Sequence, residues 1–266
     1  MIKTIFIASS SYSGSTMLDL MLGNNPDALS LGELSAFRNL YNTVTCSCGQ
    51  HDDCEVWSKI QHKNRHNYYK DLSKLTGKET FIDSSKNTFW IREQRMTQPY
   101  TPLVLIYKHP KNYAYSCMKR GNDDPRHMVT WIEYNSAILR LKPQAIVSYY
   151  DLVHEPKVTL EILCNILELP YRKRQEIYWD RHAPHHLLYG SGSAKLHLWE
   201  KGTPEYDSRA RTRQGIKPDA AFVDEISYHR KFYYSKAWKS AELDEEGREI
   251  LDVAIPLYDR LEELKI

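Results

Sequence analysis

Residues 9–16 contain the first pattern that could do chemistry, because a loop of small residues follows the short apolar run 5–8. Backbone N–H groups in such a loop, with the positive end of a following helix, bind phosphate. In nucleotide triphosphatases a lysine follows the second glycine and contacts the β- and γ-phosphates. Here Ser15 stands in that place, between Gly14 and Thr16, so the pattern favours a nucleotide without a γ-phosphate.

A second polar cluster follows the apolar run 103–107. Lys108 comes directly after the run, and Ser116 and Arg120 lie four residues apart, which places them on one face of a helix. Two cations and a hydroxyl group that converge at one point form a phosphate site. The alternative is a basic turn that is simply solvated.

The elements that must position these residues alternate along the chain. Strands are predicted at 3–8, 28–31, 79–83, 103–107 and 145–149, and helices at 15–23, 68–75, 88–95, 113–119, 125–141 and 156–167. This alternation predicts an α/β fold with a parallel sheet covered on both faces. Ligands of such sheets bind beyond the carboxyl ends of the strands.

The pattern changes after Pro170. Residues 171–182 look helical, 183–218 form a long loop, and the chain from about residue 219 looks helical again. The loop contains His, aromatic and basic residues, which favours a functional segment over a disordered one. We expect one domain over residues 1–266, with a helical C-terminal extension from about 219.

The composition is that of an ordinary soluble protein, with 41% hydrophobic and 26% charged residues among 266. The net charge of +2 gives little support to general nucleic-acid binding. The N-terminal apolar run is too short for a signal peptide, and no stretch is long enough to span a membrane. We therefore expect a cytoplasmic protein, and its oligomeric state is left open.

The two phosphate patterns together resemble those of sulfotransferases that use 3′-phosphoadenosine 5′-phosphosulfate (PAPS), in the bacterial and tyrosylprotein-sulfotransferase-like branch. The loop of that family reads Arg/Lys-Ser-Gly-Thr/Ser-Thr, and residues 12–16 (Tyr-Ser-Gly-Ser-Thr) match it except at the basic position. The 3′-phosphate motif of the family begins Arg-Asp-Pro-Arg and continues to a serine. Residues 108–111 (Lys-His-Pro-Lys) and Ser116 keep that spacing.

The resemblance, which extends over residues 3–200, implies a P-loop-like three-layer α/β fold and PAPS as co-substrate. Leu31-Gly32-Glu33 resembles a segment whose glutamate is the catalytic base, and Lys86 ends a segment whose lysine contacts the sulfonate. Residues 148–153 and 185–195 resemble two further nucleotide-binding segments. The nucleotide-binding residues so implied are Ser11, Tyr12, Ser13, Gly14, Ser15, Thr16, Lys108, Ser116, Arg120, Tyr149 and Lys195.

The expected reaction moves a sulfuryl group by in-line displacement to a hydroxyl or amine acceptor, with Glu33 as general base and Lys86 as the cation. Positioning and charge stabilisation dominate such chemistry, and it requires no metal. The acceptor would be a small molecule or a peptide. Arg38 and His109 are possible helpers, and Trp90 and Trp131 either stack on adenine or belong to the core.

Tyr12 is the main departure from the family pattern, because a tyrosine hydroxyl donates a hydrogen bond but brings no charge. It keeps open a non-catalytic nucleotide-binding module. A second alternative is a P-loop kinase of a small metabolite, which lacks its lysine here but has Asp83 as a possible Mg²⁺ ligand.

Cysteine and histidine residues form two further groups. We expect Cys46, Cys48 and Cys54 to be free thiols that pack a turn and hold no metal. The alternatives are a disulfide pair or a zinc site in which His51 completes a Cys₃His set. His182, His185 and His186 could form a metal or acid–base cluster, but we expect them to line the nucleotide pocket or face solvent.

Overall fold

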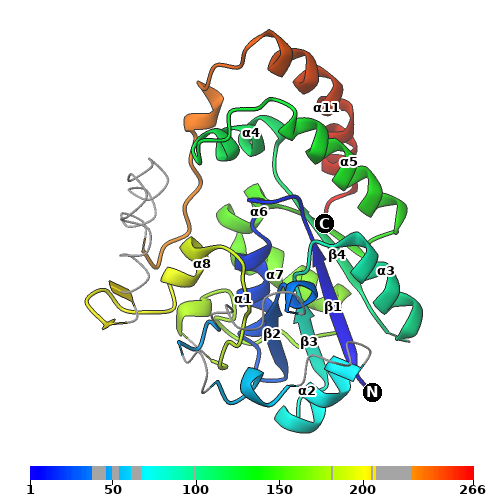
Figure 1. The fold of residues 1–266 in the computed structure, drawn as a ribbon, viewed down its shortest axis with the longest axis vertical. Helices are drawn as coiled ribbons and strands as arrows, with labels where there is room; N and C mark the ends of the chain where they lie inside the picture. The colour runs from blue at the N-terminus through cyan, green and yellow to red at the C-terminus, as the bar shows by residue number, and fades with distance from the viewer. Residues whose placement is uncertain are drawn as a thin grey trace.

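The computed structural model describes residues 1–37, 46–49, 54–60, 67–98, 100–180, 182–204, 206–207 and 229–266. Its centre is a sheet of five parallel strands in the order β2-β3-β1-β4-β5 (Figure 1). The strands are β1 (Lys3–Ala8), β2 (Ala28–Gly32), β3 (Thr80–Asp83), β4 (Leu103–Tyr107) and β5 (Ala145–Ser148). The predicted α/β fold with a parallel sheet is therefore confirmed.

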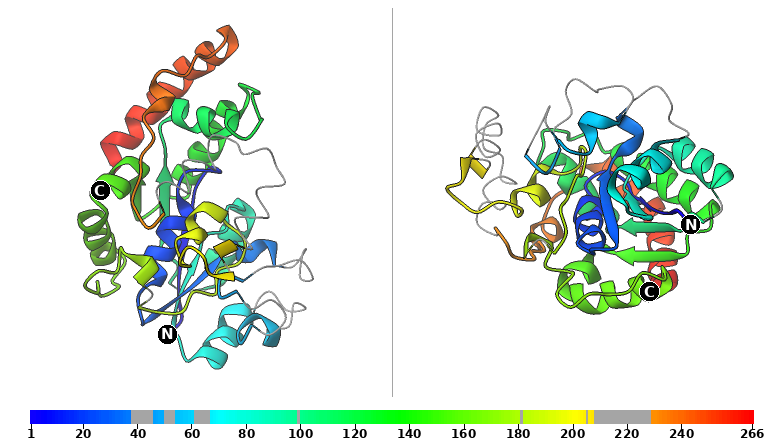
Figure 2. Two further views of the ribbon diagram at one scale, coloured as in Figure 1. Left: turned by 90° about the vertical axis from the view of Figure 1, so that its left-hand side faces the viewer. Right: turned by 90° about the horizontal axis from the view of Figure 1, so that it is seen from below.

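Helices cover both faces of this sheet (Figure 2). They are α1 (Ser15–Gly23), α2 (Tyr68–Thr76), α3 (Thr88–Thr97), α4 (Pro110–Met118), α5 (His127–Arg140), α6 (Tyr149–His154), α7 (Pro156–Ile166), α8 (Gly192–Leu196) and α11 (Glu245–Leu264). None of these described helices combines the length and the hydrophobicity that a membrane span requires.

Side chains alternate between two hydrophobic layers along β1, as successive strand residues point to opposite faces. Ile5 and Ile7 pack with α1 and α7, whereas Phe6 and Ala8 pack on the other side with residues of α2, α3, α5 and α11. All four side chains are fully buried. Because β1 is central and apolar on both faces, it holds the loop that follows it in a fixed place.

Two predicted helices differ from the structure. Residues 171–177 form turns, with only a 3₁₀ turn at Tyr178–Asp180, because Arg174 adopts a positive φ of 66° and the Asn24 amide bonds the Gln175 carbonyl at 3.1 Å. In the extension predicted from 219, residues 219–228 lie outside the described part. Residues 229–244 form turns and irregular chain with one short 3₁₀ turn, and the helix α11 begins at Glu245.

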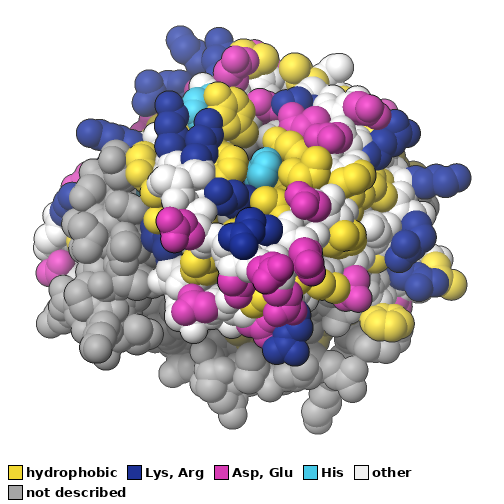
Figure 3. All heavy atoms as spheres, turned by 90° about the horizontal axis from the view of Figure 1, so that it is seen from above, with side chains coloured by type: hydrophobic (Ala, Val, Ile, Leu, Met, Phe, Trp, Pro, Cys, Tyr) yellow, Lys and Arg dark blue, Asp and Glu magenta, His cyan; other side chains and the backbone are white. Residues whose placement is uncertain are grey.

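Helix α11 packs on α4 and α5 at one end of the molecule (Figure 1). Asp244 caps it by accepting a hydrogen bond from the Gly247 N–H at 2.8 Å, and Ala254 and Leu261 are buried. On the face seen from above, Lys and Arg side chains are interspersed with Asp and Glu (Figure 3). This face therefore has no single field of one sign.

Candidate functional site

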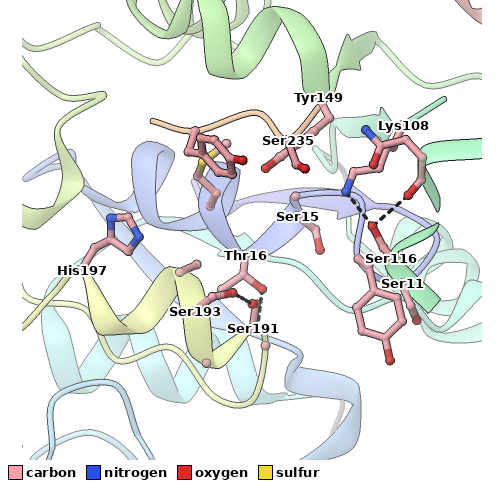
Figure 4. A pocket seen from close by; sticks show the side chains of 18 of the residues that line it. Ser11, Ser15, Thr16, Lys108, Ser116, Tyr149, Ser191, Ser193, His197 and Ser235 are labelled. Carbon is pink, nitrogen blue, oxygen red and sulfur yellow. Dashed lines mark hydrogen bonds between the residues drawn. The ribbon is translucent and has the colours of Figure 1, made fainter. Parts of the chain in front are cut away.

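The five strands end at one edge of the sheet, and a cavity of about 620 Å³ lies there. Residues that follow each strand line it, as expected at the carboxyl edge of a parallel sheet where the strand order reverses. Most of the predicted site residues are among them: Ser11, Tyr12, Gly14, Ser15, Thr16, Glu33, Lys86, Lys108, Ser116, Arg120 and Tyr149. Figure 4 shows several of these side chains around the cavity.

Gly14 forms the turn between β1 and α1. Its φ is +97°, and a Cβ atom there would lie 2.4 Å from Cδ2 of Tyr149. Glycine is thus required both by its backbone conformation and by the tyrosine ring. Helix α1 begins with Gly14 as its N-cap, which has no side chain to cap the first N–H groups, and its first two residues, Ser15 and Thr16, line the cavity.

Two of the predicted nucleotide residues do not line the cavity. Ser13 is fully buried, and its hydroxyl lies 2.8 Å from that of Ser10. Lys195 is buried in α8, whereas its neighbours Gly192, Ser193 and Ala194 do line the cavity. The predicted segment 185–195 therefore contributes residues 190–194 to the cavity lining, but not the side chain of Lys195.

Lys108 and Ser116 form one corner of the cavity. The Lys108 ammonium donates to the Ser116 hydroxyl at 3.2 Å and lies 4.5 Å from the centre of the Tyr149 ring (Figure 4). Burial, and then the charges of Arg120 and Lys119, lower the pKa of Lys108 to about 7. The lysine is therefore poised to become fully charged when an anion binds.

His109 does not line the cavity. Its Nδ1 accepts a hydrogen bond from the Lys111 N–H at 3.1 Å and caps α4, and its ring packs against Trp238 and Tyr258. Burial lowers the pKa of His109 to about 4, which keeps the imidazole neutral and able to accept.

Tyr12 lies against Arg120 at the mouth of the cavity. The Arg120 guanidinium carbon is 4.2 Å from the centre of the Tyr12 ring, and the same guanidinium donates to the Ser116 carbonyl at 2.7 Å. Tyr12 also adopts a positive φ of 61° and exposes 46% of its surface. Although the loop lacks its own basic residue, it is thus in contact with a cation from the other phosphate motif.

Glu33 and Lys86 form an ion pair on the cavity wall. Glu33 follows β2 and Lys86 follows β3, which are neighbours in the sheet. Asp19 fixes the chain before both residues, because its carboxylate accepts from the Gly32 N–H at 3.1 Å and the Ser84 hydroxyl at 2.6 Å. Complete burial raises the pKa of Asp19 to about 7.

Asp83 faces away from the cavity. Its carboxylate accepts hydrogen bonds from Tyr69 at 2.6 Å, from Trp90 at 2.9 Å and from the Ser85 N–H at 2.8 Å. Trp131 is also fully buried and donates to the Lys108 carbonyl. Neither tryptophan lines the cavity, so both belong to the core.

Sequence reasoning missed several residues of the far wall. Ser191 donates its N–H to the Thr16 hydroxyl at 2.9 Å, which joins the 190–194 segment to the first turn of α1 (Figure 4). The other missed wall residues include Ser193, His197, Phe232, Tyr233 and Ser235. The Gly-Ser-Gly-Ser run at 190–193 could have indicated that this segment lines the cavity.

The other residues that the sequence suggested for the site do not line the cavity or lie outside the described part of the chain. His185 and His186 are buried and do not line the cavity, whereas His182 is exposed and does not line it either. His51 and Arg38 lie outside the described residues.

Two solved structures are similar to this chain. The sulfotransferase domain from the curacin biosynthetic pathway aligns with a TM-score of 0.55 and 17% identity, over 95% of this chain and 97% of that one. The sulfotransferase domain from the Synechococcus PCC 7002 olefin synthase aligns with a TM-score of 0.54 and 16% identity, over 95% and 94%. No family model and no curated protein matches the sequence. The chain has the fold of a sulfotransferase domain.

Proposed function

We propose that this protein transfers a sulfuryl group from PAPS to a hydroxyl or amine acceptor. The observation that carries the proposal is that one cavity is lined by the 11–16 loop at one corner and by the Lys108–Ser116 pair at another, with Glu33 and Lys86 on its wall. Backbone N–H groups and buried cations of this kind are suited to bind anions. A nucleotide that bears phosphate at both the 3′ and 5′ positions of its ribose fits this arrangement. The sulfotransferase fold supports the same assignment.

The 5′-phosphosulfate would be held by the N–H groups of the loop and by the Ser15 and Thr16 hydroxyls. The open N-terminus of α1 favours negative charge there. The 3′-phosphate would be held by Lys108, Ser116 and Arg120, where charge-assisted hydrogen bonds are strongest. Tyr149 lies between the two corners, in contact with Gly14 on one side and Lys108 on the other.

The acceptor reacts at the wall that bears Glu33. Its oxygen or nitrogen forms a bond to sulfur while the bond from sulfur to the 5′-phosphate oxygen breaks, and its proton passes to the Glu33 carboxylate. The leaving group is adenosine 3′,5′-bisphosphate. Lys86 stabilises the charge that develops on the sulfonate and the bridging oxygen, because it lies beside Glu33 on the same wall.

A P-loop kinase remains the alternative enzyme, and one observation disfavours it. A kinase needs a carboxylate that faces the phosphates to hold Mg²⁺. Asp83 does not line the cavity, and both of its oxygens accept hydrogen bonds from the protein. A non-catalytic nucleotide-binding module is the remaining alternative, since Tyr12 leaves the loop without a charge of its own.

Two measurements separate these functions. Calorimetric titration should show binding of adenosine 3′,5′-bisphosphate and much weaker binding of ATP with Mg²⁺, whereas a kinase would show the reverse order. Single-turnover transfer from sulfur-labelled PAPS to a panel of phenols, alcohols, amines and tyrosyl peptides should then give labelled product. Binding of the bisphosphate without transfer to any acceptor in the panel would support the non-catalytic module.

A further inference from the structure

Three cysteines and one histidine meet beside Leu188, a residue that also pairs with the end of β2. The sulfur atoms of Cys46, Cys48 and Cys54 and one ring nitrogen of His186 all lie within 4.8 Å of one another. Cys46, Cys54 and His186 are each at most 4% exposed, and Cys48 is half-buried. All five cysteines of the chain are described, and none of them forms a disulfide.

The two distances from the histidine nitrogen to cysteine sulfurs match those of a tetrahedral metal site. Bonds of about 2.3 Å from zinc to sulfur and about 2.0 Å to nitrogen place neighbouring ligand atoms about 3.5–3.8 Å apart. Nδ1 of His186 is 3.4 Å from the sulfur of Cys54 and 3.7 Å from that of Cys46. Three thiolates and one imidazole form an accepted structural zinc set that leaves no coordination position open.

The groups around the cluster are those that support metal ligands. Backbone N–H groups of Cys48 and Trp57 donate to the sulfurs of Cys46 and Cys54, each at 3.5 Å, which favours thiolates. Nε2 of His186 lies 3.4 Å from the carboxylate of Glu55. A histidine that binds metal through one nitrogen commonly donates its other N–H to a carboxylate, which fixes the ring.

We propose that Cys46, Cys48, Cys54 and His186 bind one Zn²⁺ ion in a closed structural site. The sequence brought His51 to attention as the fourth ligand because it lies between Cys48 and Cys54. His51 lies outside the described residues, and among those described the histidine at the cluster is His186, which is remote in sequence. The site thus joins two distant segments of the chain.

These two segments hold the wall of the cavity. Ser47 and Leu187 are joined by a backbone hydrogen bond of 3.0 Å, and the indole of Trp57 donates to the His186 carbonyl at 2.6 Å. Leu188 in turn bonds the backbone of Leu31 at 2.8 Å and of Glu33 at 3.0 Å. The zinc site would therefore stabilise the segment that positions Glu33.

Metal content tests this proposal independently of any sulfotransferase activity. Full-length protein purified without chelators from zinc-supplemented medium should contain about one zinc per chain by plasma emission spectrometry. Cys54→Ser and His186→Asn should lose the zinc and lower the Tm by roughly 5 °C or more. Two control variants should keep the zinc: His51→Asn and Cys164→Ala. Cys164 is a buried cysteine of α7 that lies outside the cluster.

Cobalt provides a second readout that does not depend on the variants folding. Wild-type protein stripped of metal and titrated with Co²⁺ should develop thiolate-to-cobalt charge-transfer absorption and the visible bands of a tetrahedral ion, with saturation at one equivalent. A protein that is purified without zinc and gives no such bands would overturn the proposal. An intact mass lower by two hydrogen atoms, which indicates a disulfide, would also overturn it. So would loss of zinc from His51→Asn but not from His186→Asn.

Discussion

Glu33 and Lys86 form an ion pair, although 53 residues separate them in sequence. They meet because β2 and β3 are neighbours in the sheet and end at the same edge. Each side chain is about a quarter exposed, at 25% and 23%, so both can reach a molecule in the cavity. A base and a cation in contact at the cavity wall are the groups that sulfuryl transfer requires.

The carboxylate of Glu33 is expected to be the proton acceptor. Glu33→Gln keeps the shape of the side chain but removes its basicity, so single-turnover transfer from PAPS should slow by about 10²–10⁴-fold. Affinity for adenosine 3′,5′-bisphosphate should change little, because the proposed mechanism places Glu33 against the acceptor and not against the nucleotide. Glu161→Gln, on the surface of α7, is the matched control. Unchanged transfer by Glu33→Gln would remove Glu33 from the role of base.

The ring of Tyr12 is expected to hold Arg120 in place. Tyr12→Ala removes the stacking contact, which is worth about 0.5–1 kcal/mol at an exposed site, and should weaken bisphosphate binding about 2–5-fold. Tyr12→Phe keeps the ring and should bind as the wild type does. Calorimetric titration of both variants with the bisphosphate checks this. An equal loss of affinity in Tyr12→Phe and Tyr12→Ala would assign the effect to the hydroxyl group instead.

Gly14 is expected to tolerate no side chain. Gly14→Ala would strain a residue at φ +97° and push its Cβ into Tyr149, so unfolding in urea should show a loss of about 2–4 kcal/mol together with weaker nucleotide binding. Gly77→Ala separates the two causes, because Gly77 also has a positive φ of 70° but no atom within 4 Å. It should lose only about 1 kcal/mol. Equal losses at both positions would show that contact with Tyr149 is unimportant.

Nucleotide affinity should depend on pH through Lys108. In the free protein burial lowers the pKa of Lys108 to about 7, and a bound 3′-phosphate should raise it again. Binding therefore takes up a proton above pH 7, and the affinity for the bisphosphate should fall as the pH rises from about 7 to 9, by at most tenfold per pH unit.

Lys108→Arg provides the control for this pH dependence, since a guanidinium stays charged throughout the range. The affinity of that variant for the bisphosphate should be nearly constant from about pH 7 to 9. Calorimetry in buffers with different ionisation enthalpies measures the proton uptake directly. Wild-type binding without proton uptake at pH 8 would contradict the assignment.

The sequence predicted the framework of the site because local patterns encode it. The apolar strands, the glycine loop and the spacing from Lys108 to Ser116 all depend on residues close in sequence. The start of α6 at Tyr149 was missed, since its cap is the single hydroxyl of Ser148, which accepts from the Tyr150 N–H at 3.2 Å.

The contacts that were not predicted join segments far apart in the chain. Periodicity says nothing about which histidine reaches Cys46 and Cys54, so His51 was favoured over His186 on sequence proximity alone. Periodicity likewise does not predict that the Ser191 N–H bonds the Thr16 hydroxyl, or that the ring of Tyr12 contacts the Arg120 guanidinium. His109 was considered only as a possible helper, and its hydrogen bond within the first turn of α4 gives it a structural role.

The central claim is that Lys108 and Ser116 bind the 3′-phosphate while the loop binds the 5′-phosphate of one nucleotide. Calorimetric titration of adenosine 3′,5′-bisphosphate and of AMP, which lacks the 3′-phosphate, tests it most directly. The wild type should bind the bisphosphate more tightly by about 10–150-fold, the worth of a hydrogen bond to a charged group, and Lys108→Ala with Ser116→Ala should abolish that preference. Equal preference in the wild type and the double variant would contradict the account.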